Sequence, residues 1–312
     1  MTNIPFPETS RSSHDDAVVC VWSLEAQLGE GPVWSAADDA FYFVDILGHA
    51  LHRYRPSDGE RRSWTAPRRP CFLVPAQDGG LICGMEDGLY LFDPKEGRKH
   101  LIMPIEADRP GTRLNDAHLD GMGRLWFGTM DDAEKNPIGS LYSLDRTLSL
   151  RRHHNGYTIS NGPVVSPDGQ TLYHCDSAEG AIYAFDLDGD GALHNRRVFA
   201  RIEAEGQAPD GLAMDEAGTV WAGVWGGGRL ERFRADGTRL DPIMLPARNV
   251  TKAAFGGSDR RTLFITTARK GLSEAEIARQ PLNGGVFCLR VDTPGLEQGV
   301  MILPELTPDV EN

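Results

Sequence analysis

One short phrase recurs six times along the chain and constrains the fold more than any other feature. Each copy opens with small or apolar residues, continues with a turn rich in Asp and Gly, and ends in a short strand of aromatic or β-branched residues. The copies begin at Gly31, Phe72, Asn115, Asn161, Asp210 and Thr251. A strand–turn–strand unit that repeats roughly every 40–50 residues is typical of the blades of a β-propeller.

Each copy is followed by a further strand pattern and a polar turn. The further strand has an aromatic residue near its end, as at Tyr54, Phe92 and Phe233. The turn after it contains Asp or Gly, which tolerate the positive φ angles of tight hairpins. Only residues 273–279 could form a helix, and a short one. We therefore predict an all-β, six-bladed β-propeller with about four strands per blade. A β-sandwich is the alternative, but sandwiches rarely repeat one phrase six times.

Length and terminal sequence indicate how the chain is divided. The 312 residues are 40% apolar, enough for the core of one large all-β domain, and we assign residues 18–312 to a single propeller. Residues 1–17 contain Pro, Ser and Thr but no apolar stretch after a basic start, so we expect a flexible tail and no secretion signal. The strand pattern at residues 18–24 should pair with residues 286–290 and close the last blade.

Charge and cysteine content limit the partners and the compartment. A formal net charge of −13 argues against nucleic acid, whose protein partners carry a basic surface. The apolar runs are far shorter than the ~20 residues that span a bilayer, so we expect no membrane partner. The 5 cysteines are an odd number and lie mostly within strand patterns, which favours free thiols over disulfides or a zinc site. We expect a cytoplasmic monomer.

Polar residues at the openings of the copies identify a candidate metal site. The first strands of the blades line a propeller's channel, so the residues that open these strands meet at one mouth. Glu30, Asn161 and Asp210 each adjoin a glycine at this position in three different copies. Two carboxylates and an amide oxygen suit a hard divalent cation. Alternatively, Asn161 and Asp210 simply begin ordinary turns, but their shared phase in the repeat argues against this.

The same residues belong to an ordered set of motifs that resembles a known family. The set comprises Leu28-Gly29-Glu30-Gly31-Pro32-Val33-Trp34, Arg113-Leu114-Asn115-Asp116, Ile159-Ser160-Asn161-Gly162, Pro209-Asp210-Gly211 and Phe255-Gly256-Gly257. Together these motifs resemble the regucalcin and gluconolactonase family of sugar-lactone lactonases over nearly the whole chain. The resemblance implies a six-bladed propeller with one divalent metal in its channel, which hydrolyses the internal ester of aldonolactones.

The resemblance also implies a role for each of these polar residues. Glu30, Asn161 and Asp210 fall on the family's metal ligands, and Asp210 is also the proposed base. Arg113 and Asn115 fall on substrate-contacting positions. We place Asp116, which completes the same motif, in the substrate-binding group with them.

Two positions depart from the family's pattern. Many relatives have Leu where Pro163 stands. The acidic residue that regucalcin-like members carry shortly after Gly-Thr-Met is replaced here by Ala133, although Asp131 and Asp132 lie beside it. This difference concerns the outer part of the substrate pocket. Trp225, next to three glycines, is expected at a loop where its indole could pack on a sugar ring, whereas Trp126 and Trp221 are expected between blades.

Two other patterns suggest metal sites that we set aside. Residues 186–191 begin like an EF-hand loop, but Arg197 stands where the loop requires Glu and no helices flank it. His153 and His154 are adjacent on a predicted strand, so their side chains point to opposite faces and cannot share one ion.

The residue chemistry fits lactone hydrolysis. A bound cation can polarise the lactone carbonyl, Asp210 can accept a proton from water, and the guanidinium of Arg113 suits hydroxyl or carbonyl oxygens. We therefore predict a metal-dependent lactonase that converts a small sugar lactone to the aldonic acid. Calcium, magnesium, manganese, iron(II) and zinc all remain candidates for the metal. The alternatives are an aryl or phosphate esterase using the same metal, and a non-catalytic propeller that binds calcium or a protein.

Overall fold

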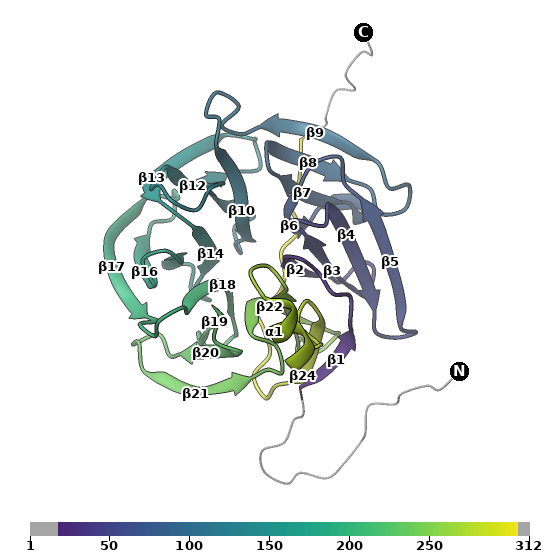
Figure 1. Cartoon of the computed structure of the whole chain (residues 1–312). Helices are drawn as coiled ribbons and strands as arrows, with labels where there is room; N and C mark the ends of the chain where they lie inside the picture. The colour runs from purple at the N-terminus through teal and green to yellow at the C-terminus, as the bar shows by residue number, and fades with distance from the viewer. Residues whose placement is uncertain (1–17, 305–312) are drawn as a thin grey trace.

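The computed structural model describes residues 18–304 and shows six four-stranded antiparallel sheets arranged in a ring around a central axis (Figure 1). The predicted six-bladed β-propeller is therefore confirmed. The tail predicted for residues 1–17 lies outside the described residues. Among the residues that are described, no helix is long and apolar enough to cross a membrane.

The first three blades follow one another along the chain, each built from the channel outwards. Blade 1 comprises β2 (Gly29–Ser35), β3 (Ala40–Asp45), β4 (Ala50–Arg55) and β5 (Glu60–Thr65). Blade 2 comprises β6 (Pro70–Pro75), β7 (Leu81–Met85), β8 (Gly88–Phe92) and β9 (Lys99–Pro104), with a 3-10 turn at Gln77–Gly79. Blade 3 comprises β10 (Thr112–Leu119), β11 (Leu125–Asp131), β12 (Gly139–Leu144) and β13 (Leu150–Tyr157).

The other three blades complete the ring. Blade 4 comprises β14 (Ser160–Val165), β15 (Thr171–Asp176), β16 (Ala181–Leu187) and β17 (Leu193–Arg201). Blade 5 comprises β18 (Ala208–Met214), β19 (Val220–Trp225), β20 (Arg229–Phe233) and β21 (Arg239–Met244). Blade 6 comprises β22 (Asn249–Gly256), β23 (Thr262–Ala268), β24 (Val286–Arg290) and β1 (Val19–Trp22).

Burial falls from the inner to the outer strands of each blade. Every residue of β2 is buried, whereas β5 at the rim of the same blade is almost entirely exposed. The core therefore lies between neighbouring blades. Trp126 packs with apolar residues of blade 4, and Trp221 with residues of blade 6, as predicted. The indole N–H of Trp126 donates to Asp120, and that of Trp221 donates to Asp215. Each Asp directly follows the inner strand of its blade, in the turn that leads to the strand with the Trp.

The ring is closed by the strand at the start of the described chain. β1 pairs antiparallel with β24, with Val19 opposite Cys288 and Cys20 opposite Phe287. This confirms the pairing predicted between residues 18–24 and 286–290. The last blade thus combines strands from both ends of the sequence, so that β24 does not present an open edge.

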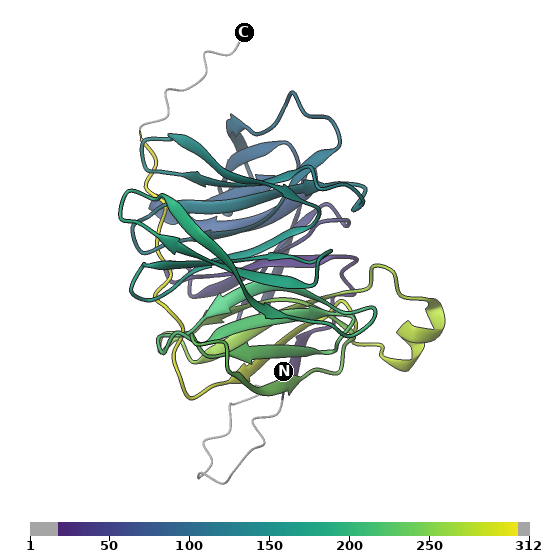
Figure 2. The ribbon, with the colours of Figure 1, turned by 90° about the vertical axis from the view of Figure 1, so that its left-hand side faces the viewer.

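The two faces of the ring carry different additions (Figure 2). On one face stands α1 (Glu274–Arg279), the short helix expected from the sequence, with Ser273 as its N-cap in a capping box. On the opposite face the C-terminal segment crosses the ring. It forms isolated bridges at Gly295 with Asp215 of blade 5 and at Met301 with Ala76 of blade 2. Met301 is fully buried there.

The features set aside in the sequence have structural explanations. All 5 cysteines are free thiols; four are buried and Cys20 is half-buried. Asp186, the first residue of the EF-hand-like segment, lies within β16, and its carboxylate pairs with Arg197 on β17. His153 bonds Ser143, whereas His154 packs against Phe185 of the next blade.

Candidate active site

Five of the six predicted site residues line one cavity. The channel opens, on the face that carries α1, into a space of about 470 Å³. Glu30 of β2, Asn161 of β14 and Asp210 of β18 reach it from three inner strands, and Arg113 and Asn115 reach it from β10. Convergence of the strand openings at one mouth is what the phase of the repeat predicts.

A β-bulge interrupts the inner strands at the same point in each of these blades. The register with the second strand shifts between Glu30 and Val33, Leu114 and Ala117, Asn161 and Val164, and Pro209 and Leu212. Bulges redirect the side chains beside them, and they recur next to active sites. Gly31 and Gly162, with φ of 52° and 53°, make two of these bulges possible. A Cβ on either glycine would lie 2.6 Å from backbone of the next blade.

The two carboxylates of the site are buried close enough to influence each other. Glu30 is 4% exposed and Asp210 is 6% exposed. Burial, together with the neighbouring Asp116 carboxylate, raises the pKa of Glu30 to about 8. Burial and the charge of Glu30 raise the pKa of Asp210 well above its ordinary value. In the described part of the chain neither carboxylate forms an ion pair, so together they favour an added cation.

Hydrogen bonds hold the amide of Asn161 in one orientation. The Asn115 Nδ2 donates to Asn161 Oδ1 at 2.8 Å and to the Ser160 carbonyl at 2.8 Å. The Asn161 Nδ2 donates to Ser177 Oγ at 2.9 Å, and that hydroxyl donates to the Pro209 carbonyl at 2.6 Å. The Asn161 amide nitrogen is thereby fixed by a hydrogen bond that points toward blade 5, and the Asn161 amide oxygen keeps a lone pair for a cation.

The residues at this site fit a divalent cation, and two of the three proposed ligands are acidic. Among residues 18–304, no three His, Cys, Asp or Glu side chains form a group that could hold a metal ion. The predicted set has two such side chains, Glu30 and Asp210, and its third oxygen comes from the amide of Asn161. Oxygen-only ligation of this kind suits hard cations better than thiophilic ones.

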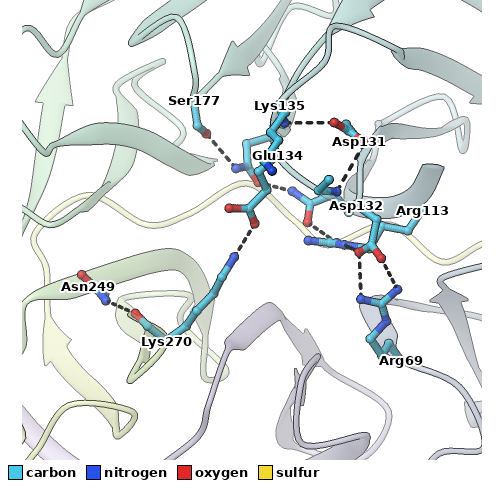
Figure 3. A network of polar contacts seen from close by, with 12 residues as sticks. Arg69, Arg113, Asp131, Asp132, Glu134, Lys135, Ser177, Asn249 and Lys270 are labelled. Carbon is cyan, nitrogen blue, oxygen red and sulfur yellow. Dashed lines mark hydrogen bonds and ion pairs between the residues drawn. The ribbon is translucent and has the colours of Figure 1, made fainter. Parts of the chain in front are cut away.

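Arg113 is fixed beside these residues by partners on two sides. Its Nη1 donates to Asn115 Oδ1 at 2.7 Å and to the Leu114 carbonyl at 2.9 Å. Its Nε lies 3.2 Å from Asp132 Oδ1, and Asp132 in turn accepts two hydrogen bonds from Arg69, at 2.8 and 3.0 Å (Figure 3). Asp132 thus connects a pocket residue to blade 2. Asp131 instead binds backbone N–H groups of its own turn.

Asp116 occupies a different place from the other predicted residues. Its side chain is 1% exposed and forms an ion pair with Lys252 Nζ at 2.5 Å. Its carboxylate also accepts hydrogen bonds from the backbone N–H groups of Ala117 and Gly162, at 2.7 and 2.8 Å. Asp116 therefore contacts the backbone next to Asn161 and does not line the cavity.

Several lining residues were not predicted from the sequence. Glu134, Arg248, Lys270 and Glu276 form two ion pairs at the rim, Lys270 with Glu134 and Arg248 with Glu276. Trp225, by contrast, was expected at a loop with its indole available to a sugar ring; it lines the cavity but is the last residue of β19, and its ring centroid lies 6.0 Å from Lys270 Nζ. The sequence does contain one indication of Glu134: it directly follows Ala133, which replaces the acidic residue of regucalcin-like members.

Comparison with known proteins places this geometry in a family. Residues 28–269 match the family model described as the SMP-30/gluconolactonase/LRE-like region. The chain belongs to this family. The matched range contains every residue of the predicted metal and substrate sites.

Relatives that are named for an enzymatic activity are similar to this chain over nearly their whole length. The chain is 38% identical to a 6-deoxy-6-sulfogluconolactonase of Pseudomonas putida, covering 90% of this chain and 97% of that protein. It is 35% identical to an L-arabinolactonase of Azospirillum brasilense, covering 86% and 90%. Among solved structures, a calcium-binding regucalcin from Agrobacterium tumefaciens superposes with a TM-score of 0.86 at 28% identity, covering 90% and 96%. Sugar lactonases therefore recur among proteins similar to this chain.

Proposed function

We propose that this protein hydrolyses a small sugar lactone to the aldonic acid with the help of one divalent metal ion. The observation that carries the proposal is the buried pair of carboxylates, Glu30 and Asp210, that line a cavity of about 470 Å³. Their raised pKa values mark a site that lacks a positive charge. The lactonase names of the relatives support the same reaction.

Glu30, Asn161 and Asp210 would hold the metal, which when bound supplies Lewis acidity toward the lactone carbonyl. Asp210 accepts a proton from the attacking water, whose oxygen bonds to the carbonyl carbon. The bond between that carbon and the ring oxygen then breaks. The proton held at Asp210 passes to the ring oxygen, which becomes a hydroxyl of the open acid.

Arg113 and Asn115 are proposed to orient the substrate. The guanidinium of Arg113 is held on two sides by Asn115 and Asp132, so its remaining N–H groups have a fixed direction. Asn115 bonds both Arg113 and Asn161, so it links the substrate side to the metal side. Fixed donors stabilise charge that develops on an oxygen without needing to reorient during the reaction.

The test separates the proposed base from the proposed ligands. Asp210→Asn keeps an oxygen ligand but removes the base, so turnover should fall by ~10²–10⁴ while metal is retained. Arg113→Lys should raise KM or lower turnover with metal content unchanged, because Lys lacks the planar fork of donors. If activity of Asp210→Asn fell only in proportion to lost metal, Asp210 would be a ligand alone.

The two alternatives give different results in the same assay. An esterase using this metal should turn over aryl or phosphate esters faster than lactones. A non-catalytic propeller should show no lactone hydrolysis above the spontaneous rate with any metal.

A further inference from the structure

An ion pair joins opposite blades across the mouth of the cavity. Lys270 follows β23 of blade 6, and Glu134 lies in the turn after β11 of blade 3. In a ring of six, blades 3 and 6 face each other, so the pair crosses the opening (Figure 3). Both side chains line the cavity and are about one-third exposed, at 33% and 35%.

The backbone on both sides of this pair is held firmly. The Asp131 carboxylate accepts hydrogen bonds from the N–H groups of Ala133, Lys135 and Asn136, which fixes the turn that carries Glu134. The Lys270 N–H donates to the Gln27 carbonyl at 2.9 Å, and the Lys270 carbonyl accepts from Asn249 Nδ2 at 3.0 Å. The side chains of Glu134 and Lys270 can therefore move when a molecule enters while their backbone stays in place.

Glu134 adopts a backbone conformation that few side chains tolerate. Its φ is 58°. Non-glycine residues with positive φ are uncommon, and such strain concentrates where a side chain must be placed for function. The turn therefore holds the carboxylate of Glu134 over the cavity at a cost in backbone strain.

The charges at the rim bear on which substrates can enter. Each of the three cations that line the cavity near the opening already has a carboxylate partner: Arg113 with Asp132, Lys270 with Glu134 and Arg248 with Glu276. A neutral hydroxyl can accept from Lys270 and donate to Glu134 without separating the pair. An anionic group must displace the carboxylate of Glu134 from Lys270, and it then lies close to the negative charge of Glu134.

We propose that Glu134 and Lys270 are specificity-determining residues that select neutral, hydroxylated lactones and reject lactones with an anionic substituent. This inference rests on the proposed function, because it concerns the substrate of the same site. The carboxylate of Glu134 repels an anionic substituent, and the ammonium of Lys270 donates hydrogen bonds to the hydroxyls of a neutral lactone.

The test compares glucono-1,5-lactone with 6-phosphoglucono-1,5-lactone, measuring kcat/KM above the spontaneous rate in the metal-loaded protein. The parent should prefer the neutral lactone. Glu134→Gln frees Lys270 and should shift the ratio toward the phosphorylated lactone by about tenfold. Lys270→Met should shift the ratio the other way, because the anion then meets Glu134 alone.

A matched control and a distinct readout keep the two proposals apart. Glu216→Gln removes a carboxylate of similar exposure that pairs with Arg260 at 2.7 Å and adjoins the C-terminal segment on the opposite face; it should leave the ratio unchanged. If Glu134→Gln and Lys270→Met left the ratio unmoved, or moved it in the same direction, the selectivity inference would be wrong. If the parent hydrolysed neither these two lactones nor any other small sugar lactone with any metal, the proposed function itself would fail.

Discussion

Breaking the buried ion pair between Lys252 and Asp116 should destabilise the propeller strongly. The two side chains are 7% and 1% exposed, and Lys252 Nζ also donates to the Ala117 carbonyl at 2.9 Å. Lys252→Met leaves the Asp116 carboxylate buried near Glu30 and Asp210 without its cation. Loss of one partner of a buried pair costs about 3–5 kcal/mol.

This cost can be expressed as a change in melting temperature. Unfolding entropy is ~2.1 cal/mol/K per residue, which over the roughly 290 residues that the structure describes gives ~0.6 kcal/mol per degree. Lys252→Met should therefore lower the Tm of the chelator-treated protein by about 5–8 °C. Thermal unfolding followed by circular dichroism measures this directly.

A double variant shows whether the uncompensated charge is the cause. Asp116→Asn combined with Lys252→Met removes both charges, so it should recover a substantial part of the loss. Arg260→Met, which breaks an exposed pair with Glu216, should change the Tm little. A Lys252→Met protein as stable as the parent, or a double variant as unstable as the sum of the single changes, would refute the reasoning.

Three further predictions follow from the same structure. Asp210→Asn should raise the Tm of the metal-free protein, because it removes one of two like charges that are buried together; an unchanged or lower Tm would count against that repulsion. Deleting residues 1–22 removes β1 and exposes the edge of β24, so the protein should aggregate in light scattering, whereas deleting residues 1–17 should not. Burial lowers the pKa of His52 from 6.5 to about 4, so the unfolded chain binds a proton that the fold excludes. The contribution of His52 to stability is then complete above pH 6.5 and is lost as pH drops toward 4, by about 3 kcal/mol. Burial also lowers the pKa values of His118, His153 and His174, so His52→Gln should reduce the slope of the stability profile measured by urea unfolding over this range without removing it.

The architecture was predictable because the repeat acts locally. Each copy encodes an inner strand, an Asp- and Gly-containing turn and a second strand, and the ring of six blades places these units in equivalent positions. The same phase placed Glu30, Asn161 and Asp210 at one mouth. The closing strand was predictable because the pattern at Val19 and Cys20 belongs to no complete blade near the start of the chain.

The remaining parts of the site depend on contacts that sequence position does not reveal. Lys270 and Glu134 are 136 residues apart and meet only because blades 3 and 6 face each other. Lys252 and Asp116 are likewise 136 residues apart, so the motif that contains Asp116 gave no sign that its carboxylate would face a lysine. The crossing of the C-terminal segment from Gly295 to Met301 rests on isolated bridges without a strand pattern.

The most direct test of the central claim is the rate of lactone hydrolysis by chelator-treated protein to which one divalent metal is added back at a time, with bound metal measured alongside. We expect no hydrolysis above the spontaneous rate without metal, recovery as about one ion binds per chain, and neither binding nor recovery in Glu30→Ala, which removes a ligand oxygen. Full activity in the metal-free protein, or equal metal binding by Glu30→Ala and the parent, would contradict a catalytic metal held by Glu30, Asn161 and Asp210.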